Sequence, residues 1–97
     1  MKAIMITYNQ ALTEKIEYMF EKLEIRGFTR FPSVFGTGSK DGEPRMGTHT
    51  WPEVNSAVIT IVPDEKVDIV LHKVQKLDEI NMEVGIRAFV WDVIKTV

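Results

Sequence analysis

The sequence predicts an α+β fold in which strands and helices follow the order β-α-β-β-α-β. Three observations support this prediction. Four short segments are rich in β-branched and aromatic residues, and two segments carry apolar residues at helical spacing. The same strand–helix–strand order also occurs before and after a long loop. Two such halves form an antiparallel four-stranded sheet with both helices on one face, the ferredoxin-like arrangement.

The length and composition predict one domain over residues 1–97, because 97 residues with 44% hydrophobic content can bury one core. A net charge of −2 disfavours binding to nucleic acid through its phosphates. The absence of cysteine excludes disulfides and thiolate metal sites. With no signal peptide and no apolar run long enough to span a membrane, we expect a cytoplasmic protein.

The first strand is expected over residues 2–8, a segment rich in Ile, Met and Thr. Asn9 can cap the helix that follows. Residues 10–25 place apolar side chains on one face of that helix, and Gly27 is the expected stop.

A second strand is expected over residues 28–35, with Pro32 favouring an edge position or a bulge. Residues 36–52 then form a long loop, which contains four of the six glycines and two of the four prolines. Loops of more than about 12–15 residues inside a compact domain are usually functional or disordered.

The second half begins with a strand over residues 55–62. Asp64 is expected to cap the next helix, whose apolar stripe spans residues 67–77. Residues 78–85 are expected to form a turn before the last strand, residues 86–94.

This last strand has apolar side chains on both faces, because Ala88 and Val90 alternate with Phe89 and Trp91. The two helices can cover only one face of the sheet. The sequence therefore predicts self-association through the other face.

The long loop contains the residues whose chemistry could serve a ligand. The glycines 36, 38 and 42 resemble a phosphate loop but match neither the P-loop nor the dinucleotide fingerprint. Met46, His49 and Glu53, with Asp41 and Glu43 nearby, are of types that bind copper or zinc, although their spacing fits no closed site. Trp51 either anchors the loop or presents a partner surface.

The chain contains no recognisable catalytic constellation. It has two histidines and several serines and threonines, but no nucleophile elbow or Ser/His/Asp order. We therefore expect a protein that is not an enzyme.

Five short motifs follow one another along the chain: Met1-Lys2-Ala3-Ile4, Ile25-Arg26-Gly27-Phe28-Thr29, Gly36-x-Gly38 with Gly42, Val62-Pro63-Asp64 with Val67-Asp68, and Arg87-Ala88-Phe89-Val90-Trp91-Asp92-Val93. In this order they resemble the PII-type signal-transduction proteins, the nitrogen regulatory protein P-II superfamily. Together they span nearly the whole length of the chain.

The resemblance implies a homotrimer that binds a small effector, often an adenine nucleotide with 2-oxoglutarate, in clefts between subunits. It also implies that residues 36–52 correspond to the family's T-loop and dock on a target protein, such as a transporter or an enzyme. The effector-binding candidates carried over are Thr29, Gly36, Gly38, Lys40 and Arg87. The candidates for partner binding are Gly42, Arg45 and Trp51.

The sequence also departs from the family pattern. The loop is short and has no tyrosine, so the family's tyrosine modification is not expected. Residues 81–86 keep one glycine, Gly85, where the family has a glycine-rich loop, and they include Glu83, so we expect fewer donors for phosphate. We also expect no counterpart of the family's C-terminal extension. The chain thus resembles a short T-loop variant of the family.

Two alternatives remain open at this point. The first is a metal-binding protein that is similar to the copper-tolerance CutA group or to short PII-like members associated with heavy-metal efflux. It would bind copper or a divalent ion such as zinc through Met46, His49 and Glu53. The second is a structural trimer without a ligand.

Overall fold

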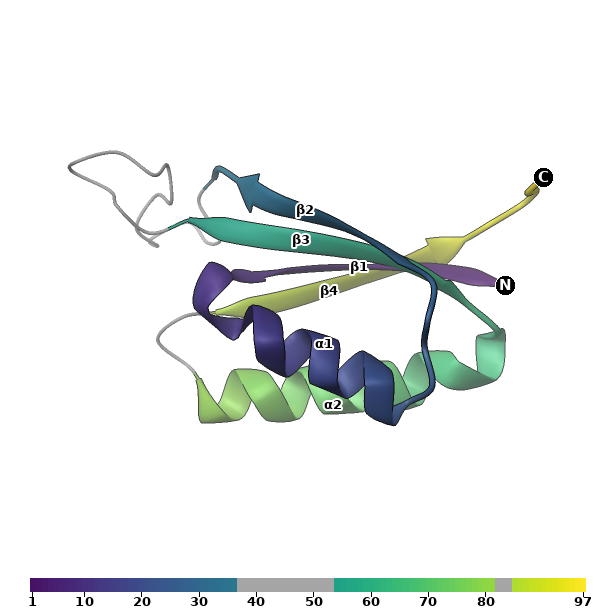
Figure 1. The fold of residues 1–97 in the computed structure, drawn as a ribbon. Coiled ribbons are helices and arrows are strands. Elements are labelled where there is room, and N and C mark those ends of the chain that lie inside the picture. Colours follow the sequence, from purple (N-terminus) through teal and green to yellow (C-terminus); the bar gives the residue numbers. More distant parts are fainter. Residues whose placement is uncertain (37–53, 82–84) are drawn as a thin grey trace.

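The computed structural model describes residues 1–36, 54–81 and 85–97 (Figure 1). Its strands are β1 (Lys2–Asn9), β2 (Phe28–Val34), β3 (Asn55–Val62) and β4 (Ile86–Asp92). Its helices are α1 (Thr13–Lys22) and α2 (Val67–Ile80), and each follows a 3₁₀ turn, η1 (Gln10–Leu12) and η2 (Asp64–Lys66).

The four strands form one antiparallel sheet in the order β2-β3-β1-β4. Figure 1 shows α1 and α2 as a layer on one side of this sheet. The predicted α+β fold, with its βαββαβ order and both helices on one face, is confirmed. The central strands β3 and β1 come from different halves of the sequence.

The core lies between the sheet and the helices. β1 contributes Ile4, Ile6 and Tyr8, none of which is exposed to solvent. Val58 of β3 and Val70 of α2 are also fully buried in this cluster. Burial of a large apolar side chain stabilises a fold by about 1.5–3 kcal/mol, so this layer determines which face of each strand points inward.

The first helix begins as predicted but ends earlier. The Asn9 side chain accepts a hydrogen bond from the Ala11 amide at 2.9 Å, so Asn9 caps the 3₁₀ turn that leads into α1. The helix ends at Lys22, and Glu24 adopts a left-handed backbone with φ of 58°. The predicted stop at Gly27 was therefore wrong, because the reversal occurs at Glu24, three residues earlier.

One local and one tertiary hydrogen bond stabilise this helix end. The Ile25 amide donates to the Phe20 carbonyl at 2.8 Å, and buried Ile25 belongs to the same apolar cluster as Phe20. The Lys66 ammonium donates to the Leu23 carbonyl at 2.7 Å. These bonds satisfy carbonyls that a helix end leaves free, and they offset the cost of a left-handed glutamate.

The second helix starts differently from the prediction. The Asp64 side chain makes no capping hydrogen bond, and Pro63 occupies the cap position in an extended conformation. Asp64 instead accepts a hydrogen bond from the Met1 amino group at 2.6 Å. The α2 helix then continues to Ile80, so the expected turn at residue 78 starts inside the last helical turn.

Strand β2 is an edge strand with an irregular register, as Pro32 suggested. The pairing with β3 shifts between Phe31 and Val34. Proline has no amide proton for the ladder, but its carbonyl still needs a donor. The Ser56 hydroxyl of β3 supplies it at 2.7 Å.

The remaining strands differ little from the predicted ranges, except that β4 ends at Asp92, two residues early. None of the helices in the described parts of the chain is long and apolar enough to cross a bilayer. Apart from Gly36, the predicted loop 36–52 lies outside the described residues.

The Tyr8 hydroxyl provides a test of the core. It is buried and has no hydrogen-bond partner among the described residues. The hydroxyls of Thr13 and Ser56 lie nearby, and each uses its own proton in a bond to a backbone carbonyl, so neither donates to Tyr8. Burial raises the pKa of Tyr8 above its ordinary value of 10.0.

We predict that Tyr8→Phe has little effect on stability near pH 7 and removes a stability loss at alkaline pH. Above pH 10.0 the unfolded wild type loses the tyrosine proton while the folded protein keeps it, so the free energy of unfolding falls as pH rises. Urea unfolding at about pH 8 and about pH 11 measures the difference. Tyr18→Phe, at an exposed position, is the control. An equal alkaline loss in wild type and Tyr8→Phe would contradict the prediction.

Candidate functional site

We call the sheet face that the helices leave uncovered the open face. Its members follow from the strand register, in which Met5 pairs with Ile59 on one side and with Phe89 on the other. The open face consists of Ala3, Met5, Thr7, Thr29, Phe31, Ala57, Ile59, Ile61, Arg87, Phe89 and Trp91.

This face is unusually apolar for a surface. Phe31, Ile61, Phe89 and Trp91 are between 44% and 54% exposed, and each lies beside other apolar residues of the face. Large contiguous apolar patches on a protein surface generally mark interaction sites. The open face is therefore the main candidate interface of the described chain.

Arg87, at the start of edge strand β4, is the charged residue of this face. Its side chain is 56% exposed. Atom Nη1 donates to the Ile86 carbonyl at 2.9 Å and lies 3.7 Å from a carboxylate oxygen of Asp78. These contacts hold a guanidinium group at the rim of the open face, next to the last turn of α2.

Asp78 organises this corner, and the sequence analysis did not identify it. One oxygen accepts the Ile86 amide at 3.0 Å, and the other faces Arg87. An acid in the last turn of a helix is disfavoured by the helix dipole. An aspartate in this unfavourable position, nine residues before an arginine, was the signal in the sequence that could have indicated a contact with the following strand.

Gly85 forms the entrance to β4. Its φ of 69° lies in the left-handed region, which glycine adopts without strain. This is the single glycine that the sequence retains in the 81–86 stretch, and the backbone conformation accounts for it. Glu83 lies outside the described residues.

Thr29, the candidate on β2, is exposed on the same open face and pairs with Ile59. It is not close to Arg87 within one chain. The two residues lie on opposite edge strands, three strand spacings apart, or about 14 Å across the sheet. A single chain cannot bring both side chains to one small ligand.

The remaining candidates belong to the loop. Gly36 follows β2 at the end of a described segment, and a side chain at this position would meet nothing within 4 Å. The other candidates lie outside the described residues: Gly38, Lys40, Gly42, Arg45, Met46, His49, Trp51 and Glu53. Within the described ranges, no cluster of three or more histidine or carboxylate side chains could hold a metal.

Comparison with protein families assigns the chain. The family model described as nitrogen regulatory protein P-II matches residues 1–97. The chain belongs to this family. P-II proteins are regulatory trimers that bind small effectors and target proteins.

Solved structures support the fold assignment. CPII, a nitrogen regulatory PII-like protein from Thiomonas intermedia K12 bound to ADP, AMP and bicarbonate, is 22% identical, with a TM-score of 0.78 over 95% of this chain and 84% of CPII. The apo form of CPII is 17% identical, with a TM-score of 0.68 over 95% and 89% of the two chains.

A putative PII-like signalling protein from Thermus thermophilus is 21% identical, with a TM-score of 0.67 over 95% of this chain and 85% of that protein. A comparison with curated proteins finds no match. Together these findings favour the P-II family over the CutA-like alternative, and they do not support the copper or zinc site.

Two substitutions of Asp78 can separate its role as acceptor of the Ile86 amide from its role as the charge beside Arg87. Asp78→Ala removes both the acceptor of the Ile86 amide and the charge beside Arg87, and should destabilise the protein by about 1–2 kcal/mol. Asp78→Asn keeps an acceptor oxygen and should cost less than about 1 kcal/mol, because exposed ion pairs contribute little.

Urea unfolding at one protein concentration measures both variants. Amide exchange at Ile86 should accelerate in Asp78→Ala and stay close to wild type in Asp78→Asn. Equal effects of the two substitutions on stability and on exchange of this amide would contradict the prediction. The hydrogen bond from the Ile86 amide would then not be the main contribution of Asp78 to stability.

Proposed function

We propose that this protein is a PII-like regulator that acts as a homotrimer. It binds a small anionic effector in the clefts between subunits and regulates a partner protein through loop 36–52. The observation that carries the proposal is the whole-length P-II match on a chain whose sheet leaves one apolar face uncovered.

The open face supports the trimer. Phe31, Ile61, Phe89 and Trp91 remain exposed in the single chain, although burial of such side chains is favourable by about 1.5–3 kcal/mol each. Packing three open faces around a common axis would bury them. The helices would then form the outer layer of the assembly.

The trimer also brings the two effector-binding candidates together. Thr29 and Arg87 lie on opposite edge strands, so the β2 edge of one subunit can face the β4 edge of another. An effector that contacts both residues would lie at this junction. Binding of the effector at this junction would then depend on assembly of the trimer.

Arg87 fits an anionic effector. In the described residues its contacts use Nη1, so the donors on Nε and Nη2 are available for a phosphate or carboxylate group. The hydrogen bond from Nη1 to the Ile86 carbonyl, with Asp78 3.7 Å away, orients the side chain beforehand, which reduces the entropy lost on binding. CPII, whose structure is reported with ADP, AMP and bicarbonate, suggests an adenine nucleotide as the effector class.

Signal output is assigned to loop 36–52. Gly36 lies two residues beyond the end of edge strand β2, so the loop continues from the strand that carries Thr29. Effector binding would favour one loop conformation among several and thereby present or withdraw Gly42, Arg45 and Trp51. The target would be a transporter or an enzyme whose activity depends on this contact.

The trimer is tested with Trp91→Glu. A charge placed in an apolar interface costs several kcal/mol, so the variant should be monomeric while the wild type has about three times the 11.1 kDa chain mass. Ile69→Glu, at an exposed apolar position on α2, is the matched control and should remain trimeric. Light scattering after size exclusion measures the masses. A monomeric wild type would reject the trimer.

The effector site is tested by thermal shift and calorimetry with ADP and AMP, each with and without bicarbonate. A ligand at 100 times its dissociation constant stabilises a fold by about 2.7 kcal/mol, which raises the midpoint by several degrees. Arg87→Gln should weaken binding by about tenfold or more, because a charge-assisted hydrogen bond contributes about 1.5–3 kcal/mol. Arg26→Gln, at an exposed position outside the sheet, should bind as wild type does. Wild-type protein that binds neither nucleotide would reject this effector class.

A further inference from the structure

A groove lies between α1 and α2 on the outer side of the helix layer. Its volume is about 510 Å³. No strand residue lines it, so it is separate from the open face and from the corner at Arg87. The lining residues are Glu14, Lys15, Tyr18, Met19, Lys22, Leu23, Lys73, Lys76, Leu77 and Ile80.

The middle of the groove is apolar. Met19, Leu23 and Leu77 form its inner part, and each also packs against the core. Tyr18 and Ile80 are 58% and 74% exposed. Exposed aromatic and aliphatic side chains around a concave surface are typical of protein-binding sites, and methionine adapts its shape to a partner.

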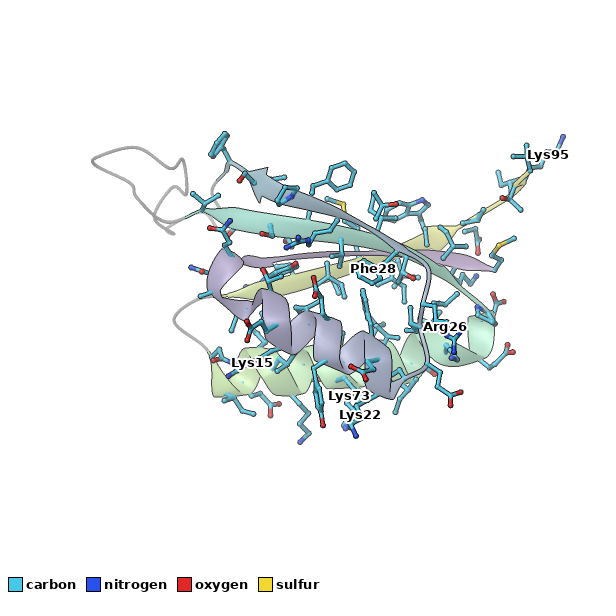
Figure 2. All side chains as sticks on the ribbon, viewed as in Figure 1. Lys15, Lys22, Arg26, Phe28, Lys73 and Lys95 are labelled. Carbon is cyan, nitrogen blue, oxygen red and sulfur yellow. The ribbon has the colours of Figure 1, made fainter. Side chains whose placement is uncertain are left out.

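Positive charge surrounds this apolar strip. Four of the ten lining residues are lysines and one is a glutamate, although the chain as a whole carries a net charge of −2. Figure 2 shows Lys15, Lys22 and Lys73 along the two helices. In the described part of the chain, Lys15 and Lys73 form no ion pair with an acid, whereas Lys76 lies 4.0 Å from Glu79.

The length of the groove walls matches a short helical ligand. On the α1 side the lining residues recur from Glu14 to Leu23, the residue that follows the helix, and on α2 they occupy positions 73, 76, 77 and 80, which is an i, i+3, i+4, i+7 pattern. Each wall is therefore about two to two and a half helical turns long, roughly 10–14 Å. A helix that binds in a groove uses anchors over this same i to i+7 distance.

We propose that this groove docks an acidic amphipathic helix from a partner protein. The apolar stripe of that helix would cover Met19 and Leu77, and its Asp and Glu residues would face the lysines. A second copy of this chain is a poor occupant, because two lysine rims would repel each other. The site goes beyond effector sensing and loop signalling, and it remains accessible when open faces associate, since it lies on the opposite side of the sheet.

The probe is a fluorescein-labelled peptide of about 15 residues, with leucines at i, i+3, i+4 and i+7 and glutamates on the flanking positions. Fluorescence anisotropy against the full-length protein should show saturable binding that weakens as salt is added. A scrambled peptide of the same composition and a peptide with lysine in place of glutamate should not bind.

Variants of the protein locate the binding. Lys15→Glu/Lys73→Glu should lower the affinity for the acidic peptide by about tenfold or more, and it should allow the lysine peptide to bind. Arg26→Glu/Lys95→Glu is the matched double charge reversal outside the groove and should stay within about twofold of wild type. Ile80→Ser, at a largely exposed position, should also weaken binding and thereby report the apolar contact.

The outcomes separate this proposal from effector sensing. Peptide binding should persist in Arg87→Gln and in Trp91→Glu, which test the effector site and the trimer. The proposal is overturned if the acidic peptide does not bind, if the scrambled peptide binds equally, or if Lys15→Glu/Lys73→Glu binds as wild type. It is also overturned if anionic phosphatidylserine vesicles, and not the peptide, bind in a way that Lys15→Glu/Lys73→Glu abolishes. The same holds if sedimentation shows that a second copy of the chain occupies the groove.

Discussion

The arrangement depends on one constraint: the sheet is apolar on both faces, but the chain has only two helices to cover one of them. Alternation along β1 and β4 sends Ile4 and Val90 towards the helices and Met5 and Trp91 to the open face. A chain of this size buries only about 60–68% of its unfolded surface by itself. Burying the second face between subunits adds to that core. In the proposed trimer, an assembly state that P-II proteins share, the constraint would be satisfied in this way.

Hydrophobic periodicity was sufficient to predict the fold, because the strands and helices are amphipathic in ways that a linear sequence displays. The helix ends were harder to predict. The left-handed residue after α1 is Glu24 and not Gly27, because Lys66 and buried Ile25 stabilise that conformation from outside the helix. Asp64 forms an ion pair with a distant amino group and not a cap. Contacts between residues so far apart in sequence leave no local pattern.

The candidate site was only partly accessible to sequence reasoning. The resemblance pointed to Arg87 and Thr29, but the register was needed to place them on opposite edges of one face. That placement changes the interpretation, because a site made of both residues must include two chains. Asp78 was missed because its carboxylate became informative only when α2 and β4 were seen to meet. The loop candidates remain predictions from the resemblance.

The distribution of charge follows from the same constraint. Charged residues are depleted at the centre of protein interfaces, and among its described residues the open face, the proposed interface, has a single charged one, Arg87, at its rim. The lysines that surround Tyr18 and Leu77 are on the opposite side, where like charges oppose self-association but leave an apolar strip for a different, acidic partner. Separating the two surfaces lets one small chain assemble and dock without the two contacts competing for the same side chains. A ligand bound in the groove would contact α2, whose last turn carries Asp78 next to Arg87 of the effector junction.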